Sequence, residues 1–380
     1  MRQVDYIMIN VSSILELLDK IKYEYGDKKV VELYEKRILE LKDPRLSFEF
    51  AKRYKGANIK AHEEVVANSN NYEYETYLFQ YKFAHEIKGA DIYKLSKKVI
   101  ESGNPYYNFL FAKDIKGIDI KAHEEVILNK KVADVSLLFA RYIDGADIKA
   151  HEKIVLDSLD ARSNYEFAKY VKGADILAHC KAVAKSLNAG FCYEFAHDIK
   201  NADIKMLEEA IINSNDSYYI LHFARNIKGA NKKSLGQAII KNGDAEFNFK
   251  FAKFIKGSNV LAHGQVVIDS GNPEYNYKFA KSIKGADIKS HEQVVIQSKN
   301  PYYCLLFSKN IKGSNIFSLA KVIFESENSD MIKSFLDSHP DFDLNSFREK
   351  KESKTVEKDA NIIKLNKILY KKEKYFNRKM

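Results

Sequence analysis

The sequence has no tryptophan, 5 prolines, 16 glycines and three cysteines among its 380 residues. So few turn-forming residues argue against an all-β chain. Cys180, Cys192 and Cys304 are odd in number and lack paired spacing, so we expect neither a disulfide framework nor a thiolate metal site. Residues 1–20 lack the pattern of a secretory signal, and no apolar run of about 18 residues is present. We therefore expect a cytoplasmic protein that does not associate with membranes.

The composition indicates a folded and basic chain. Hydrophobic residues make up 45% and aromatic residues 12% of the sequence, which is enough for a substantial core. The formal net charge is +10. A positive charge of this size favours encounters with an acidic protein surface, a nucleoprotein complex, DNA or RNA.

One pattern of seventeen residues recurs along the chain. It reads FAKSIKGADIKSHEQVV from Phe279, and related stretches begin at Phe111 and Phe167. Its first residue recurs every 28 residues, and an earlier copy begins 33 residues before the next, which indicates one insertion of five residues. The ten copies begin at Phe50, Phe83, Phe111, Phe139, Phe167, Phe195, Phe223, Phe251, Phe279 and Phe307.

Two further columns of the repeat predict helix ends. Six residues after the Phe, nine copies have glycine and one has Asn201, as expected for a left-handed residue that ends a helix. Two residues later every copy has Asp or Asn, the residues that cap a helix N-terminus. Asp43-Pro44, Asn104-Pro105, Asn272-Pro273 and Asn300-Pro301 predict the start of the other helix.

Each copy is therefore predicted to be a helical hairpin, and the apolar residues on two sides of its first helix require packed neighbours. We predict an all-α, right-handed α-solenoid of about ten 28-residue hairpins. The expected divisions are an N-terminal helical cap (1–49), the ten-copy array (50–327), a closing half-repeat (328–340) and a basic C-terminal tail (341–380), expected to be helical.

This arrangement resembles the two-helix solenoid class that includes HEAT and tetratricopeptide arrays, over about residues 28–339. The resemblance is architectural, because the period of 28 is shorter than that of either and the tetratricopeptide pattern requires a tryptophan. It implies a scaffold that binds other macromolecules along an extended face.

A regular column of histidines suggests metal binding at first. His62, His123, His151, His179, His263 and His291 each stand one turn into the second helix of a copy. However, four other copies have leucine in this column, and no second ligand accompanies any of the histidines. We therefore expect half-buried packing positions that bind no metal and that tolerate leucine.

Two columns of basic residues are the candidate partner-binding residues. Two residues after the Phe stand Lys52, His85, Lys113, Arg141, Lys169, His197, Arg225, Lys253, Lys281 and Lys309. Five residues after it stand Lys55, Lys88, Lys116, Asp144, Lys172, Lys200, Lys228, Lys256, Lys284 and Lys312. Because the two columns are three residues apart, we expect them to be neighbours on one helix face. The alternative is that these cations only complement the helix dipole, which contributes about 0.3–1 kcal/mol each.

The C-terminal tail is a second basic feature. Residues 341–380 contain 12 Lys or Arg against 7 Asp or Glu. Ile362, Ile363, Leu365, Ile368 and Leu369 would form the apolar side of one basic amphipathic helix. Such a helix is either a solvated or docking helix, or an arm that binds a partner or a nucleic acid.

Catalytic motifs are absent from the sequence. It has no glycine-rich phosphate loop, Cys-His pair or GxSxG turn. The sequence therefore predicts a non-enzymatic binding scaffold or inhibitor without a cofactor, which recognises a protein or a protein–nucleic-acid complex. A sequence-tolerant DNA- or RNA-binding protein is the alternative. A helical-repeat DNA glycosylase that uses Asp144 is a remote alternative.

Overall fold

The structure, a computed structural model, describes residues 28–69 and 73–345. All regular secondary structure within these ranges is helical, which confirms the predicted all-α helical-repeat solenoid. Its right-handedness stays a prediction, as do the domain boundaries. The amphipathic helix predicted for the tail lies outside the described residues.

The chain divides between Ser186 and Leu187 into two compact units. The first unit contains α2 (Lys28–Leu41), α3 (Pro44–Arg53), α4 (Ile59–Asn68), α5 (Glu73–Glu86), α6 (Ile92–Ser102), α7 (Pro105–Asp114), α8 (Ile120–Lys130), α9 (Ala133–Tyr142), α10 (Ile148–Ser158), α11 (Ala161–Tyr170) and α12 (Ile176–Lys185). The second unit contains α13 (Ala189–Asp198), α14 (Ile204–Ser214), α15 (Ser217–Asn226), α16 (Lys232–Asn242), α17 (Ala245–Phe254), α18 (Val260–Asp269), α19 (Pro273–Ser282), α20 (Ile288–Gln297), α21 (Pro301–Asn310), α22 (Ile316–Glu325) and α23 (Ser329–Ser338).

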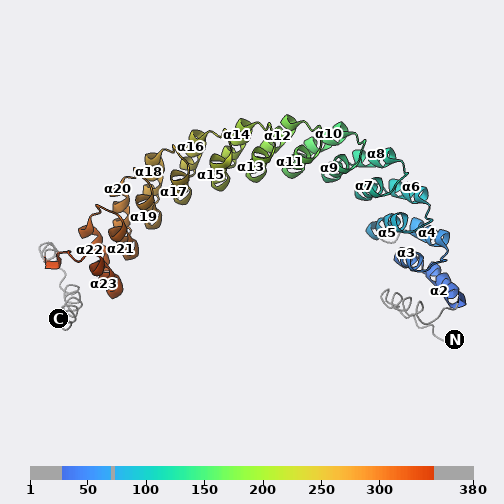
Figure 1. The fold of residues 1–380 in the computed structure, drawn as a ribbon, viewed down its shortest axis with the longest axis horizontal. Helices are drawn as coiled ribbons and strands as arrows, with labels where there is room; N and C mark the ends of the chain where they lie inside the picture. Colours follow the sequence, from blue (N-terminus) through green and yellow to red (C-terminus); the bar gives the residue numbers. More distant parts are fainter. Residues whose placement is uncertain (1–27, 70–72, 346–380) are drawn as a thin grey trace. The chain divides into compact units, whose positions relative to one another are not determined.

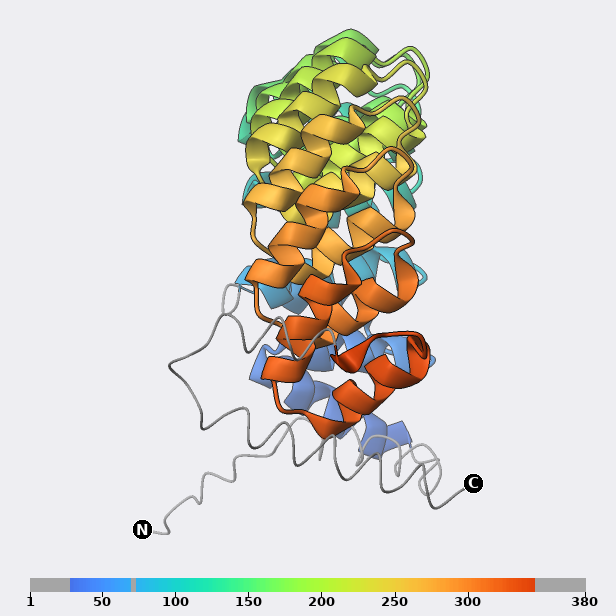
Figure 2. The same cartoon turned by 90° about the vertical axis from the view of Figure 1, so that its left-hand side faces the viewer.

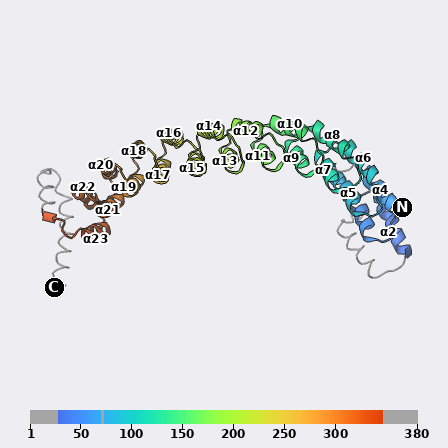
Figure 3. The same ribbon diagram turned by 45° about the horizontal axis from the view of Figure 1, so that its top comes forward.

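Within each unit the helices form two layers. From α3 onward, each odd-numbered helix pairs with the following even-numbered helix in a hairpin, as α7 does with α8. Odd-numbered helices pack on the next odd-numbered helix, and even-numbered helices on the next even-numbered one, so the hairpins stack in register (Figures 1 and 3). The orange and red helices of the second unit show this parallel stacking clearly (Figure 2).

The repeated phenylalanine is the centre of each hairpin's core. All ten of these side chains are fully buried, with exposures of 1% or less. In the first unit, for example, Phe139 packs with Ile127 from the preceding even-numbered helix and with Phe109 from the preceding odd-numbered helix. Because each Phe contacts the previous copy, one hairpin alone would leave this apolar surface exposed, and stacking is needed to bury it.

The predicted N-caps are confirmed. Every even-numbered helix from α4 to α22 begins after its Asp or Asn, whose side chain accepts a backbone N–H of the first turn. The four Asx-Pro pairs also cap odd-numbered helices as predicted. Val132 departs from this pattern, because it precedes α9 without a side-chain cap.

The predicted role of the glycine column is wrong in position, although its left-handed conformation is confirmed. The odd-numbered helix ends earlier, as at Tyr142, and Ile143 follows in extended conformation. Gly145 has a φ of +81° and is the third residue of a turn closed by the bond from the Ala146 N–H to the Ile143 carbonyl. A turn of this kind requires positive φ at its third residue, which glycine and asparagine adopt most easily.

Left-handed residues that do end helices lie instead after even-numbered helices. Gly103 and Gly243 occupy two of these positions, but Lys131, Leu159 and Asn215 have φ values of 53–56° in the same place. This column could not be recognised from the sequence, because its side chains are chemically mixed.

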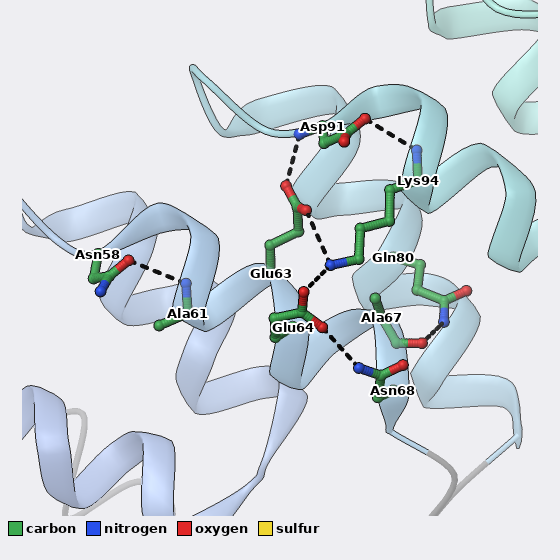
Figure 4. Close-up of polar contacts among 9 residues, drawn as sticks. All are labelled: Asn58, Ala61, Glu63, Glu64, Ala67, Asn68, Gln80, Asp91 and Lys94. Atoms are coloured by element: carbon green, nitrogen blue, oxygen red, sulfur yellow. Dashed lines mark hydrogen bonds and ion pairs between the residues drawn. The ribbon is translucent and has the colours of Figure 1, made fainter.

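A glutamate column connects successive even-numbered helices. Glu63 on α4 is buried and accepts the N–H of Asp91, which is the N-cap of α6, over 2.6 Å (Figure 4). Lys94 lies 3.7 Å from the same carboxylate and also pairs with Glu64. Equivalent bonds join Glu124 to Asp147, Glu152 to Asp175, Glu208 to Asn231 and Glu292 to Asn315.

The first and last described helices continue the repeat. Glu35 on α2 accepts the Asn58 N–H as the glutamate column does, so α2 takes the place of an even-numbered helix. At the other end, α23 begins after the N-cap Asn328 and buries Phe335, which lies 28 residues after Phe307. The outermost described helices are therefore held by the same kinds of contact as the interior ones.

Replacement of Gly145 by valine should destabilise the turn between α9 and α10. A Cβ at this position meets no atom within 4 Å, so the cost comes from the positive φ and not from a clash. For a β-branched residue we expect a loss of about 1–2 kcal/mol or more in the free energy of unfolding. Gly145→Asn is the matched control, because Asn201 occupies this position in another copy at a φ of +65°. Equal melting temperatures for both variants would contradict the assignment.

Candidate binding surface

Both basic columns lie on the surface, as the sequence predicts. All ten residues two positions after the Phe are exposed, and so are all ten residues five positions after it. The prediction that the two columns share a helix face is wrong. The odd-numbered helices end three residues after the Phe, so Lys116, Lys172 and their equivalents lie in the turn beyond the helix.

This placement weakens the view that the cations only complement helix dipoles. The first column lies in the last helical turn, where a cation is favoured by the dipole. The second column follows the C-cap residue, as Lys116 follows Ile115, so it is outside that last turn. Another reason is needed for nine lysines at these turn positions.

Few of these cations are neutralised by carboxylates. Lys52 pairs with Glu86 over 2.6 Å, and Lys309 donates to the Ser334 hydroxyl. Within residues 28–69 and 73–345, no ion pair is formed by four cations of the first column: Lys113, Arg141, Arg225 and Lys253. The lysines of the second column form no ion pair within these ranges either. A surface cation without an internal partner remains available to an anionic ligand.

Aromatic rings lie between the cations of the first column in the first unit. We define Lys113, Arg141, Tyr142, Lys169 and Tyr170, on α7, α9 and α11, as the aromatic–basic strip. Tyr142 is 48% and Tyr170 45% exposed. The Arg141 guanidinium lies 3.9 Å from the Tyr170 ring centre and 4.9 Å from the Tyr142 ring centre. The Lys113 ammonium lies 5.6 Å from the Tyr142 ring centre, and the Lys169 ammonium lies 5.5 Å from the Tyr170 ring centre.

The second unit contains a smaller equivalent. Phe254 at the end of α17 is 47% exposed, and Arg225 and Lys253 lie 5.2 and 5.5 Å from its ring centre. All three exposed rings stand three residues after the repeated Phe. This column is not recognisable from the sequence, because it also contains Asp114, Asp198 and Asn226.

The candidate catalytic residue lies in an open position. Asp144 is exposed in the turn that connects α9 and α10, between the buried Ile143 and Gly145. A glycosylase flips its target nucleobase into a closely fitting active-site pocket, whereas Asp144 is an exposed turn residue. Within the described ranges there is also no group of three or more His, Cys, Asp or Glu side chains placed to hold a metal ion.

The expectation of half-buried histidines is wrong, because all six are 1% exposed or less. Each imidazole packs against the Phe of its own copy, with ring centres 4.8–5.5 Å apart. Four of them place Nδ1 within 2.7–2.8 Å of a buried asparagine Oδ1 three residues before that Phe. The pairs are Asn108–His123, Asn164–His179, Asn248–His263 and Asn276–His291.

The asparagine connects three helices. The amide nitrogen of Asn108 donates to the Val99 carbonyl at the end of α6 and to the Asn104 carbonyl before α7. Its Oδ1 therefore accepts from His123 Nδ1–H on α8, which leaves His123 Nε2 to accept from the Ser96 hydroxyl on α6 over 2.7 Å. This closed network fixes α6, α7 and α8 relative to one another.

The two columns vary together between copies. Where the histidine is present, the position three residues before the Phe is Asn or Ser; where leucine replaces it, that position is Gln80, Cys192, Ile220 or Cys304. A comparison of these two columns in the sequence would have revealed the pairing. The expectation that the histidine column tolerates leucine therefore applies only to copies in which the asparagine is absent too.

Burial keeps these histidines neutral. It lowers the pKa of His123, His263 and His291 to about 4. Burial also lowers the pKa of His62, His151 and His179, against the opposing effect of Glu35, Glu124 and Glu152, respectively. The same cause raises the pKa of the column carboxyls Glu208 and Glu292 and of the Cys304 thiol, the last to about 12.

A scan of family models and searches of curated proteins and of solved structures found no significant match to this chain. None of the helices described here has both the length and the apolar character needed to cross a bilayer. The three cysteines are buried, and none of them forms a disulfide within the described residues.

His123→Leu should destabilise the protein, because it leaves the buried Asn108 Oδ1 without its donor. We expect a loss of about 1–3 kcal/mol in the free energy of unfolding. The double variant Asn108→Cys with His123→Leu reproduces the natural Cys192–Leu207 pair and should recover most of this loss. Chemical denaturation of both variants measures the difference. If the single and double variants are equally stable, the pair does not act as a unit.

Acid should destabilise the protein through these histidines. The unfolded chain has histidine pKa values near 6.5, and the folded values are lower, so the unfolded state binds more protons as the pH falls. For His123, His263 and His291 the stabilisation is complete above about pH 6.5 and declines towards pH 4, by about 1.4 kcal/mol per pH unit for each of them. The free energy of unfolding, measured at pH 7 and pH 5, tests this expectation. The double variant Asn108→Cys with His123→Leu is the control, because it has one buried histidine fewer and its stability should change less with pH. An equal slope would contradict the assignment.

Proposed function

We propose that this chain is a non-enzymatic binding scaffold that recognises an anionic macromolecule through the two basic columns. An acidic protein surface or a nucleoprotein complex fits this surface chemically. The observation that carries the proposal is the exposure of both columns without carboxylate partners for most of their cations in the described residues.

The repeated spacing supports recognition over an extended surface. Successive odd-numbered helices pack directly on one another within each unit, so their cations recur once in each layer. Packed helices lie about 8–10 Å apart, which is close to the Debye length of about 8 Å at physiological salt. The cations therefore repel one another only weakly when free, and they act together on one ligand with many negative charges.

The buried polar columns stabilise the fold. The histidines, the asparagines and most residues of the glutamate column are buried and bonded to neighbouring helices. The basic columns form no part of that network. A surface that can change without loss of the fold is the usual location of recognition in a repeat protein.

Reversal of four charges of the first column should abolish recognition and leave the fold intact. The variant combines Lys113→Glu, Arg141→Glu, Lys169→Glu and Arg225→Glu. Each substitution changes the charge by −2, so the net charge falls from +10 to +2. Electrostatic steering contributes about 10–1000-fold to association rates, and we expect a loss of this size. The measurement is capture of partners from native lysate, with and without nuclease, at increasing salt.

A matched control reverses four exposed lysines in the first turns of even-numbered helices: Lys121, Lys149, Lys205 and Lys289. This variant has the same net charge of +2 but keeps both basic columns. It should retain the partner. Equal loss in both variants would show that total charge, and not the columns, determines binding. Retention in both would remove the first column from the site.

A further inference from the structure

We propose that the aromatic–basic strip binds single-stranded nucleic acid, with phosphates at its cations and bases on its tyrosine rings. This inference rests on the proposed function and specifies the chemical class of ligand for the same surface. The strip consists of Lys113, Arg141, Tyr142, Lys169 and Tyr170 on three successive odd-numbered helices.

The exposed rings distinguish this ligand from other anions. Tyr142 and Tyr170 expose nearly half of their surface although they neighbour a well-packed core. An acidic peptide needs the cations but offers no flat surface to the rings. Duplex DNA presents phosphates but keeps its base faces stacked inside. Only an unpaired strand offers phosphates and free base faces together.

The cations are held in a geometry suited to phosphate. Arg141 lies between the two rings, 4.9 and 3.9 Å from their centres, so its guanidinium is held in place by stacking. Such a guanidinium still directs its N–H groups outward and can bind two phosphate oxygens at once. The Lys169 ammonium also donates to the Tyr165 hydroxyl, which fixes its position beside Tyr170.

The strip is a specific feature of part of the array and not a general property of the repeat. The copy on α7 contributes only Lys113 to the strip and has Asp114 at the third position after its Phe, and the copy that follows the strip has Asp198 there. Asp114 is occupied by a hydrogen bond from the Tyr81 hydroxyl over 2.7 Å. A carboxylate offers no ring for a base, so base stacking should be confined to α9 and α11, which carry the tyrosines.

The proposal is tested by titrating the full chain into a labelled oligothymidine and measuring fluorescence anisotropy. An oligothymidine of about 30 nucleotides is long enough for several stacking sites. Tyr142→Ala with Tyr170→Ala should reduce the affinity by about 5–150-fold per stacked base, while the slope of log affinity against log salt stays unchanged. Lys113→Gln with Arg141→Gln should instead flatten that slope by about 0.7 for each phosphate that these side chains no longer neutralise. Tyr142→Phe with Tyr170→Phe should bind as the wild type does.

Two controls separate stacking from indirect effects. Tyr106→Ala with Tyr302→Ala removes two tyrosines of 45% and 50% exposure from the opposite ends of odd-numbered helices and should leave the affinity unchanged. A duplex of the same length should lose little affinity in the Tyr142 and Tyr170 alanine variant. If the duplex loses as much as the single strand, the rings only position the cations and the inference is overturned.

The remaining outcomes distinguish this inference from the proposed function. Tighter binding of a polyglutamate peptide than of oligothymidine would overturn the inference and favour an acidic protein. If oligothymidine does not bind but charge reversal abolishes capture from lysate, only the inference fails. If oligothymidine does not bind and capture survives charge reversal, both fail.

Discussion

Short helices leave most of their backbone polar groups without partners inside the helix, and this constraint shapes the whole repeat. The first four N–H groups and the last four carbonyls of any helix lack internal partners. In helices of ten or eleven residues these groups are a large fraction of the total. Each copy has four such ends close to its core, so it must supply side chains that satisfy them.

The repeat meets this requirement with a fixed set of polar side chains. Asp and Asn cap the helix N-termini, and the buried glutamate accepts the N–H of the next cap. A serine such as Ser158 donates to the Val155 carbonyl at the end of α10 and accepts the Asp160 N–H before α11. Asn164 donates to the same Val155 carbonyl. Polar residues buried in this way determine the register between hairpins, which apolar packing alone would leave less defined.

The same contacts explain which features of the fold could be predicted from the sequence and which could not. Helix caps and the Phe column could be predicted because their causes are local or periodic, and both are confirmed. The turn around Gly145 was misplaced because glycine serves both helix ends and turns, and only the extended Ile143 distinguishes them. The full burial of His123 depends on its bond to Asn108, which lies fifteen residues away in the sequence. The histidine column by itself therefore could not predict this burial.

The binding surface was predicted only in part, for a physical reason. A periodic basic column predicts exposure, because lysine and arginine are rarely buried without partners. The position of a tyrosine is less determined, since its ring is apolar and its hydroxyl polar, and the same residue type occurs buried at Tyr107 and exposed at Tyr142. Only the packing of neighbouring helices decides between these environments, and it placed Tyr142 and Tyr170 beside Arg141.

The location of the Asn–His pair has a consequence for the length of such arrays. Asn108 and His123 lie within one helical hairpin, α7 and α8, so duplication or deletion of a whole hairpin carries both partners together. The contact between copies is less demanding, because the position that faces the next histidine is Ser96, Glu124 or Gly236 in different copies. An array built in this way can gain or lose hairpins by recombination without leaving a buried polar group without its partner. The length of the array can therefore change faster than the residues of its core.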